Sequence, residues 1–483
     1  MKRSAILILA DGARYDVFEE LLHAGRLPNI REHIVQRGDY RRMTTVFTST
    51  TGPAYLPFFT GCFPGTANLP GIRWFDKKAY ATKAFYNPHR FRSYCGWEGF
   101  FMNRDIRPDL KTLFDLTDGP INVFGPITRG LPAGRNQRPL YKAWLMARAH
   151  GNGRYEPVDR KALKIFLKAM HGESEFRFLV LPGIDGISHN TFPRHARTIA
   201  AYEFLDRAVG EIVKKLKESR RYDSTIIGIC SDHGLTQTLT HFDVPVFMEK
   251  TLNIPTLYYT NIFRINPQAS AHVSGNGMIH IYFKNGNWLK PCYYEDMIQM
   301  HPNAVEEFLA KDAVDLVISK TAGGYIRVDS ARGSALIKEL AGAVEYRVLN
   351  GDPFGFSKLP EVMTYDLALE KTFDTDYPDA IVQTAQIFRS ERCGDLLLSA
   401  KVGYDLRFKW ESPEHKSSHG SLHREHMMTP FCLSHPIQKA FLRSADVFPS
   451  ILNLLGKEIP DGIDGKSFVS MPAVSHVLPA VAI

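Results

Sequence analysis

Three short apolar runs, each followed closely by an aspartate, constrain the fold of this chain more than any other feature of its sequence. The runs cover residues 4–10, 177–182 and 224–230, and the aspartates that follow are Asp11, Asp185 and Asp232. Continuous apolar runs of this length are typical of strands that are buried on both faces of a parallel sheet. We therefore expect the three segments to be central strands of one sheet.

Amphipathic helical patterns lie between these runs, at residues 15–25, 160–170 and 196–218. Strands that alternate with helices predict an α/β fold with a doubly wound, mostly parallel sheet and helices on both faces. Ligands of such folds bind beyond the carboxyl ends of the strands. The polar residues that follow the three runs should therefore share one edge of the sheet.

Two segments interrupt the alternation. Residues 66–110 are rich in aromatic residues, arginine and asparagine, and residues 245–405 combine short strand-like pieces with glycine turns and helices. We interpret the second segment as an inserted α+β cap subdomain over the site. The catalytic core is then expected to comprise residues 1–240 and 405–483, with an insertion at about 66–110.

The composition limits the classes of partner that we expect and the cellular compartment in which we expect the protein. The formal net charge of +8 favours an anionic substrate. The sequence contains no run of five Lys or Arg residues, so we do not expect nucleic acid as a stable partner. The six cysteines form no CxxC pair, which indicates reduced thiols. The apolar run near the N-terminus is shorter than that of a signal peptide, and no stretch is long enough to span a membrane. We expect a cytoplasmic protein, and the oligomeric state is left open.

Three aspartates and three histidines stand just after apolar runs or in Gly/Ser loops: Asp11, Asp185, His189, Asp232, His233 and His419. Taken singly, each has an ordinary explanation, because an Asp after a strand often caps a helix and His-rich loops are often only solvated. Together they offer carboxylate oxygens and imidazole nitrogens, the donors that zinc takes. Two such ions can stabilise both the attacking and the leaving oxygen of a phosphoryl displacement. The set on one sheet edge therefore predicts a binuclear metal site.

The order of these motifs resembles the alkaline phosphatase superfamily, and within it the type I phosphodiesterase/nucleotide pyrophosphatase branch. The similarity rests on the six residues in their order and on three segments, "SDHG", "SSHGSLHREHMMTPF" and "ADVFPSILNLLGKEIPDGIDGKSF". It covers about residues 1–65, 175–240 and 405–470. It implies an alkaline phosphatase-like fold and two zinc ions, with manganese as the alternative metal.

The resemblance also implies how the ligands are shared. One zinc ion would be held by Asp185, His189 and His419. The other would be held by Asp11, Asp232 and His233, with the oxygen of the nucleophile completing the site.

By position in the family motif, that nucleophile is Thr51, ten residues before the glycine of Thr60-Gly61. The residues themselves agree, because Pro53 suits the first turn of a short helix over residues 53–61, although Pro57 should distort its middle. A residue just before such a helix faces free backbone N–H groups, which would stabilise an alkoxide and a bound phosphate. An ordinary helix N-cap at Thr51 is compatible with this role, and Thr50 is the alternative nucleophile.

One position departs from the resemblance. The branch has Phe-Pro-Asn after the nucleophile, and its Asn helps to hold a phosphoryl oxygen, whereas this chain has Gly52-Pro53-Ala54. Another hydrogen-bond donor must therefore hold this phosphoryl oxygen, and the candidates are Arg14, Arg73 and the backbone amide of Gly52. An arginine would suit a dianionic monoester better than a diester, because its planar fork pairs with two free oxygens.

The sequence thus predicts a metal-dependent phosphoester hydrolase that acts on a small anionic substrate through a covalent phospho-threonine. Phosphomonoesterases, phosphonate (C–P) hydrolases and phosphomutases of the same scaffold are alternatives. A nucleic-acid-binding protein and a non-catalytic interaction module are alternatives of another class.

Overall fold

A seven-stranded sheet forms the centre of one half of the structure, a computed structural model that describes residues 3–85, 87–259, 263–408, 411 and 414–470. Its strands, in spatial order, are β22 (Leu442–Arg443), β2 (Asp39–Thr44), β21 (Met428–Leu433), β7 (Thr225–Cys230), β1 (Ser4–Ala10), β6 (Phe176–Leu181) and β5 (Ile121–Val123). Strands β5, β6, β1 and β7 are parallel to one another, and β21 runs antiparallel to its neighbours β7 and β2. The three expected strands are β1, β6 and β7, so the mostly parallel α/β sheet is confirmed.

The register of the central strands brings their carboxyl ends to one level. Ala10 at the end of β1 lies opposite Leu181 of β6, and Leu9 lies opposite Cys230 of β7. Every residue of β6 and β7 is buried, as their continuous apolar runs require. The polar residues that follow these strands therefore meet at the same edge of the sheet.

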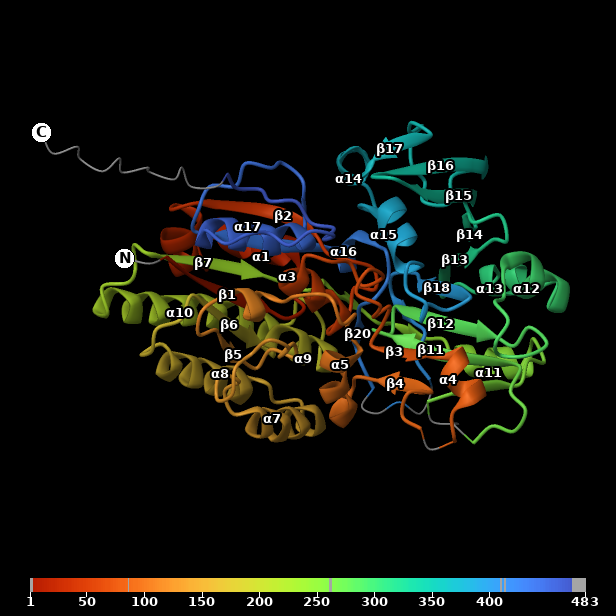
Figure 1. The fold of residues 1–483 in the computed structure, drawn as a ribbon, viewed down its shortest axis with the longest axis horizontal. Coiled ribbons are helices and arrows are strands. Elements are labelled where there is room, and N and C mark those ends of the chain that lie inside the picture. The colour runs from red at the N-terminus through yellow and green to blue at the C-terminus, as the bar shows by residue number, and fades with distance from the viewer. Residues whose placement is uncertain (1–2, 86, 260–262, 409–410, 412–413, 471–483) are drawn as a thin grey trace, which may run out of the picture.

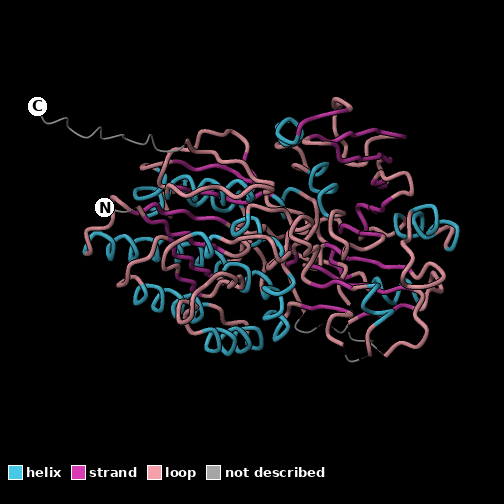
Figure 2. Tube along the Cα trace, viewed as in Figure 1, coloured by secondary structure: helices cyan, strands magenta, loops and turns pink. Residues whose placement is uncertain are grey.

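Helices flank the strands of this sheet on two sides in Figure 2. Helix α1 (Tyr15–His23) follows β1, and α10 (Ala196–Glu218) has the bounds expected from its apolar stripe. Helix α8 (Glu156–Ala169) packs on β5 and β6, and α17 (Val447–Leu455) packs on β1. The same sheet thus carries helices from both ends of the chain.

A nine-stranded sheet occupies the other half of the molecule, on the right in Figure 1. In spatial order it comprises β10 (Thr256–Tyr258), β11 (Ala269–Ser274), β12 (Met278–Phe283), β18 (Leu396–Ala400), β13 (Val314–Lys320), β14 (Ile326–Ser330), β15 (Gly333–Leu340), β16 (Ala343–Asn350) and β17 (Val362–Thr364). All pairs except β10–β11 are antiparallel. These strands fall within residues 245–405, and the division of the chain into a core and a cap subdomain at these positions stays a proposal.

The segment at 66–110 forms a two-stranded sheet and short helices beside the nine-stranded sheet. These are β3 (Arg73–Phe75), α4 (Lys77–Thr82), β4 (Phe91–Ser93), the 3₁₀-helix η3 (Gly96–Phe101) and α5 (Met102–Asp105). Other elements outside the two large sheets include α2 (Pro28–Ile30), η1 (Arg31–Val35), α6 (Leu113–Leu116), α7 (Pro139–Asn152), α9 (Gly183–Asn190), β8 (Thr236–Gln237), β9 (Thr240–His241), β19 (Tyr404–Asp405), β20 (Ser417–Ser418), α16 (Arg424–Met427) and η4 (Ser444–Asp446). Helices α11 (Val244–Lys250), α12 (Tyr294–Met300), α13 (Ala304–Leu309), α14 (Tyr365–Thr372) and α15 (Ala380–Ile387) accompany the nine-stranded sheet.

All six cysteines are free, and Cys95 is the exposed one among them. Within the described ranges, no helix combines the length and the apolar character that crossing a membrane requires. The expected cytoplasmic compartment stays a prediction.

Candidate functional site

Asp11 and Asp185 are brought together by a close approach between the end of β1 and helix α9. Gly12 has a φ of +71°, and a Cβ at this residue would lie 2.8 Å from the Cβ of Asp185. The amide of Asp185 donates a hydrogen bond to the carbonyl of Asp11 at 3.0 Å. A glycine after the strand therefore provides both the left-handed conformation and the space that the second carboxylate occupies.

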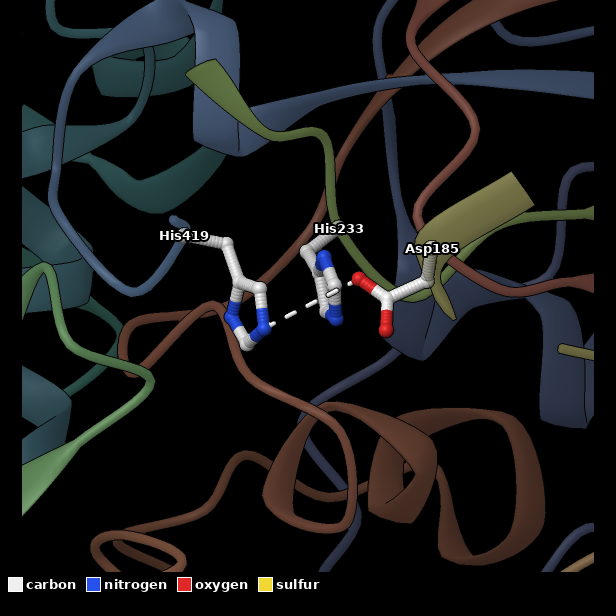
Figure 3. Close-up of side chains that lie close together, drawn as sticks. All are labelled: Asp185, His233 and His419. Carbon is white, nitrogen blue, oxygen red and sulfur yellow. Dashed lines mark ion pairs between the residues drawn. The ribbon is translucent and has the colours of Figure 1, made fainter. Parts of the chain in front are cut away.

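Two acidic-histidine clusters meet at the carboxyl edge of the seven-stranded sheet. Asp11, Asp232 and His233 form one cluster, and Asp185, His233 and His419 form the other, each with potential ligand atoms within 4.8 Å of one another. In the first, Nε2 of His233 lies 3.6 Å from Oδ1 of Asp11 and 3.3 Å from Oδ2 of Asp232. In the second, Nε2 of His419 lies 3.9 Å from Oδ1 of Asp185 (Figure 3).

The first cluster contains the three residues expected to hold one metal ion. The second differs from the expected set of Asp185, His189 and His419, because His233 takes the place of His189. His189 is nevertheless adjacent, with its Nε2 3.2 Å from Oδ1 of Asp185. His233 lies between the two clusters, and its ring stacks on that of His419 with 3.8 Å between centroids.

All three of these histidines direct Nε2 toward the clusters because backbone carbonyls hold their other nitrogen. The Nδ1–H of His189 donates to the carbonyl of Ser417 at 2.7 Å, and that of His419 donates to Ser49 at 3.1 Å. His233 donates from Nδ1 to its neighbour Gly234 at 3.0 Å. A histidine that ligates a metal ion commonly uses this arrangement, since the carbonyl fixes the tautomer and the orientation of the ring.

The surroundings of the three acids shift their pKa values in opposite directions. Burial, together with the carboxylates of Asp232 and Asp185, raises the pKa of Asp11 well above its usual range. Burial and the Asp185 carboxylate likewise raise the pKa of Asp232 to about 8. Burial would also raise the pKa of Asp185, but His189 and His419 hold it below its usual range. Three buried carboxylates this close together favour a cation between them.

The side-chain atoms of the clusters fit divalent metal ions. Oδ2 of Asp232 is buried without a hydrogen-bond partner among the described residues. Oδ1 of Asp185 is buried too, and it has contacts with His189 and His419 but no well-formed hydrogen bond. An unsatisfied carboxylate oxygen in the interior is costly, and a metal ion would satisfy it. Carboxylate and imidazole donors together suit zinc.

Thr51 directs its hydroxyl into the first cluster. Its Oγ1 donates to Oδ1 of Asp11 at 3.3 Å and lies 3.1 Å from Nε2 of His233. The expected short helix is present, but it is divided into a 3₁₀ turn, η2 (Pro53–Tyr55), and α3 (Leu56–Thr60). The division falls between Tyr55 and Leu56. It lies close to Pro57, which was expected to distort the helix and is in the first turn of α3.

Thr51 is not the N-cap of this helix, which was the ordinary alternative explanation for this residue. The capping position belongs to Gly52, whose φ of +100° and ψ of −82° are open to glycine. The Thr51 hydroxyl therefore does not cap this helix. The neighbouring Thr50 has a buried Oγ1 that has no hydrogen-bond partner among the described residues.

The two arginines expected as substrate contacts already have carboxylate partners. Arg14 pairs with Asp16 at 2.8 Å and with Glu425 at 2.6 Å. Arg73 pairs with Glu411 at 2.5 Å. Their roles toward a substrate, like that of the Gly52 amide, stay predictions.

A turn between β11 and β12, which the sequence did not single out, holds the loop of His419. The amide of Gly277 donates to the carbonyl of His419 at 2.7 Å, and the amide of His419 donates to the carbonyl of Gly275 at 3.2 Å. A Cβ on Gly275, whose φ is +69°, would lie 2.9 Å from Nδ1 of His419. The "SGNG" turn at residues 274–277 was a visible signal, but its position beside the site follows only from the tertiary structure.

Tyr55 is a second residue that the sequence did not point to. It is fully buried, and its hydroxyl donates a hydrogen bond to Oδ2 of Asp11 at 3.0 Å. The bond leaves Oδ1 of Asp11 directed at Thr51 and His233. Tyr55 therefore orients the carboxylate that the nucleophile candidate contacts.

Comparison with known proteins identifies relatives over almost the whole chain. The sequence profile of the type I phosphodiesterase/nucleotide pyrophosphatase family matches residues 5–422. No match is found among curated protein sequences.

Solved structures with a similar fold include phosphonoacetate hydrolase from Sinorhizobium meliloti 1021 in complex with phosphonoformate, at a TM-score of 0.57 and 14% identity over 94% of this chain and 96% of that chain. Murine ectonucleotide pyrophosphatase/phosphodiesterase 5 aligns at a TM-score of 0.55 and 13% identity over 95% and 96%. An inactive threonine-to-alanine variant of the murine protein in complex with AMP aligns at 0.54 and 14% over the same shares. These likenesses establish the fold.

Proposed function

This chain belongs to the type I phosphodiesterase/nucleotide pyrophosphatase family of the alkaline phosphatase superfamily, and on that premise we propose that it hydrolyses phosphoesters through a covalent phospho-threonine on Thr51. The family and its structural neighbours are hydrolases of phosphoester or phosphonate bonds. The proposal concerns the nucleophile, the metals and the class of substrate.

The position of the Thr51 hydroxyl carries the proposal. It touches Asp11 and His233, and His233 is common to both acidic-histidine clusters. A metal ion held by Asp11, Asp232 and His233 would lie beside this hydroxyl and would lower its pKa. Thr50, the alternative, has its hydroxyl buried away from any hydrogen-bond partner among the described residues.

The metals follow from the donor sets. We assign one zinc ion to Asp11, Asp232 and His233 and the other to Asp185, His189 and His419, with manganese as the alternative metal. When bound, the two ions would neutralise the charge on the attacking and leaving oxygens and lower the pKa of the nucleophile. The unsatisfied oxygens of Asp185 and Asp232 support this assignment.

The residues of the chain then account for two displacements. The Thr51 hydroxyl gives up its proton to solvent, and its oxygen forms a bond to phosphorus as the bond from phosphorus to the leaving oxygen breaks. The leaving alcohol takes up a proton. A water oxygen next attacks phosphorus from the opposite side, which releases phosphate, or a phosphate monoester from a diester, and restores the Thr51 hydroxyl.

The substrate is a small anionic phosphoester, and its alcohol is not specified by these residues. The family name points to diesters and nucleotide pyrophosphates. The departure at Ala54 points instead to a monoester, because an Asn three residues after the nucleophile is missing. The murine relative in complex with AMP makes a nucleotide ester a useful test substrate.

The test compares Thr51→Ala with Thr50→Ala in the zinc-loaded protein. The substrates are p-nitrophenyl phosphate, bis-p-nitrophenyl phosphate, a nucleotide ester of thymidine and phosphonoacetate. Thr51→Ala should lose turnover of every substrate that the wild type cleaves, while elemental analysis still finds both metals. Thr50→Ala should remain active and should form a phosphorylated protein that mass spectrometry locates on Thr51. Near-normal turnover by Thr51→Ala would show that the nucleophile is another residue.

A further inference from the structure

Helix α16 packs against a loop that carries two of the metal-ligand candidates. Its backbone approaches the loop after β7 so closely that a Cβ on Gly234 would lie 2.1 Å from the carbonyl oxygen of Glu425. The amide of Gly234, which directly follows His233, donates a hydrogen bond to the carbonyl of His426 at 2.9 Å. The helix therefore supports the loop that supplies Asp232 and His233.

The side chain of His426 joins this loop to the loop of His419. The ring is buried, and its two nitrogens have different partners. Nε2 lies 2.8 Å from the hydroxyl of Thr236, three residues after His233. Nδ1 accepts a hydrogen bond from the amide of Ser421 at 3.1 Å and lies 2.8 Å from the hydroxyl of the same residue, two residues after His419. One ring thus contacts both loops.

The partners of His426 determine its tautomer. A backbone amide can only donate, so Nδ1 is the unprotonated nitrogen and the proton of the neutral ring is on Nε2. Nε2–H then donates to Thr236, and the hydroxyl of Ser421, which accepts from the amide of His423 at 3.3 Å, donates to Nδ1. Burial also lowers the pKa of His426 well below its ordinary value, which favours the neutral ring. Each nitrogen therefore serves a different loop.

The loop of His419 is in turn connected to the segment of Thr51. The carbonyl of Ser421 accepts a hydrogen bond from the hydroxyl of Ser49 at 2.9 Å, and the carbonyl of Ser49 accepts one from Nδ1–H of His419 at 3.1 Å. Ser49 is two residues before Thr51. A displacement of Ser421 would therefore move both a metal-ligand candidate and the candidate nucleophile.

The spacing between the two loops determines the geometry of both clusters. Strands β8 and β20, which pair the loops directly, contribute only two residues each. The rings of His233 and His419 lie beside each other, with 3.8 Å between their centroids (Figure 3). Because His233 belongs to both clusters, a shift of one loop against the other would change both at once.

We propose that His426 is a positioning residue of the hydrolytic site, whose ring holds the loop of Asp232 and His233 in register with the loop of His419. The inference rests on the proposed function, since it concerns the metal ligands and the nucleophile assigned there. His426 acts through these residues, because its hydrogen bonds go to their neighbours in the chain. Residues that orient metal ligands in this way typically contribute about tenfold to a hundredfold to metal affinity or activity.

The experiment compares His426→Phe, His426→Asn and His426→Gln. Phenylalanine fills the space of the ring but forms neither hydrogen bond. Asparagine can place its amide oxygen near the position of Nδ1 and accept from Ser421, whereas glutamine can place its amide nitrogen near that of Nε2 and donate to Thr236. His272→Phe is the matched control, because His272 is equally buried and its Nε2 lies 2.8 Å from the hydroxyl of Ser270 in the same strand, β11.

Zinc affinity and turnover should fall together in His426→Phe. Zinc affinity, measured by competition with a chelator, should fall by about tenfold to a hundredfold. At saturating zinc, kcat for a substrate that the wild type cleaves should fall by about the same factor, because the ligands and the nucleophile are displaced from their productive positions. The asparagine and glutamine variants should each recover part of both losses. His272→Phe should bind zinc as the wild type does, even if its unfolding temperature falls as far.

The visible absorption of the cobalt-loaded proteins separates a change in position from a general loss of stability. It depends on the number and geometry of the ligands, so the spectrum of His426→Phe should differ from that of wild type and the spectrum of His272→Phe should not. A wild-type cobalt spectrum in folded His426→Phe would overturn the positioning role, as would an equal loss of zinc affinity in His272→Phe. Failure of either amide variant to recover would overturn the bridge, because the ring would then not serve both loops.

The two proposals fail in different ways. Zinc affinity and the cobalt spectrum test the role of His426 whether or not the protein cleaves the chosen substrates. A wild-type protein that binds both metals and hydrolyses none of the substrates would contradict the proposed function alone. Thermal unfolding shows whether each variant is folded. If His426→Phe is not, the asparagine and glutamine variants should still each lose part of the wild-type zinc affinity, and two wild-type affinities would overturn the inference.

Discussion

Asp232 should make the metal-free protein less stable as the pH rises, and Asp232→Asn should remove the contribution of this residue to that dependence. The side chain is completely buried, its Oδ1 accepts a hydrogen bond from the amide of Gly12 at 3.3 Å, and its Oδ2 has no hydrogen-bond partner among the described residues. Burial first, and then the Asp185 carboxylate, raises its pKa from 3.8 to about 8. Asparagine keeps the shape and the contact with Gly12 but carries no charge.

The direction of this pH dependence follows from which state of the protein, folded or unfolded, keeps the proton on Asp232. Between pH 4 and pH 8 the folded metal-free protein keeps the proton on Asp232, whereas the unfolded chain has lost it. The unfolded state therefore binds fewer protons, and the free energy of unfolding falls as the pH rises, by about 1.4 kcal/mol per pH unit for one such group. Because the transition flattens near the folded pKa, the expected loss between pH 7 and pH 8 is about 1 kcal/mol.

Urea unfolding of chelator-treated wild type and Asp232→Asn at pH 7 and pH 8 measures this difference. Asp159 is also buried, and burial raises its pKa to about 8, but it is present in both proteins and cancels. Wild type should lose about 1 kcal/mol more than the variant between the two pH values. Zinc should stabilise wild type at pH 8 and have a much smaller effect on Asp232→Asn. Parallel pH dependences of the two metal-free proteins would refute the reasoning.

Two further substitutions test the supports of the site. Gly275→Ala should lower stability and zinc content more than Gly286→Ala. Both glycines have left-handed φ values, +69° and +68°, but a Cβ at Gly275 would lie 2.9 Å from Nδ1 of His419 and 2.9 Å from the Cβ of Thr50, whereas a Cβ at Gly286 has no neighbour within 4 Å among the described residues. Thermal unfolding and elemental analysis of the pair separate these contacts from the backbone strain, and equal losses would show that the contacts with His419 and Thr50 are unimportant. Tyr55→Phe removes the hydrogen bond to Oδ2 of Asp11 and should weaken zinc binding by about tenfold, as loss of a ligand-orienting group usually does. A zinc titration monitored by calorimetry measures this, and unchanged affinity would mean that the Asp11 carboxylate needs no such support.

Much of the fold follows from local sequence. Residues 4–10 and 196–218 have the bounds in the structure that their apolar patterns predict, since a buried strand and a long amphipathic helix each carry a strong periodic signal. The family was predicted from the order of a few motifs, and the profile match over residues 5–422 confirms it. The short helix after Thr51 was also expected, including the disturbance at Pro57.

The composition of the second cluster was harder to foresee. His189 and His233 both lie near Asp185, and which of them completes the set depends on how the side chains of helix α9 and of the loop after β7 pack together. Sequence spacing carries no information about that packing. The N-cap at Gly52 in place of Thr51 is a similar case, because the capping residue is decided by a local backbone conformation that glycine can adopt and threonine rarely does.

The sequence by itself determined which residues can do chemistry at the carboxyl edge of the sheet, because strand ends, helix starts and donor types are local properties. Only the tertiary structure decided what surrounds them. The turn at Gly275 comes from the nine-stranded sheet, and Tyr55 reaches Asp11 from the 3₁₀ turn η2 that follows Thr51. These contacts join residues far apart in the chain, and the free energy that selects them is that of packing the whole interior.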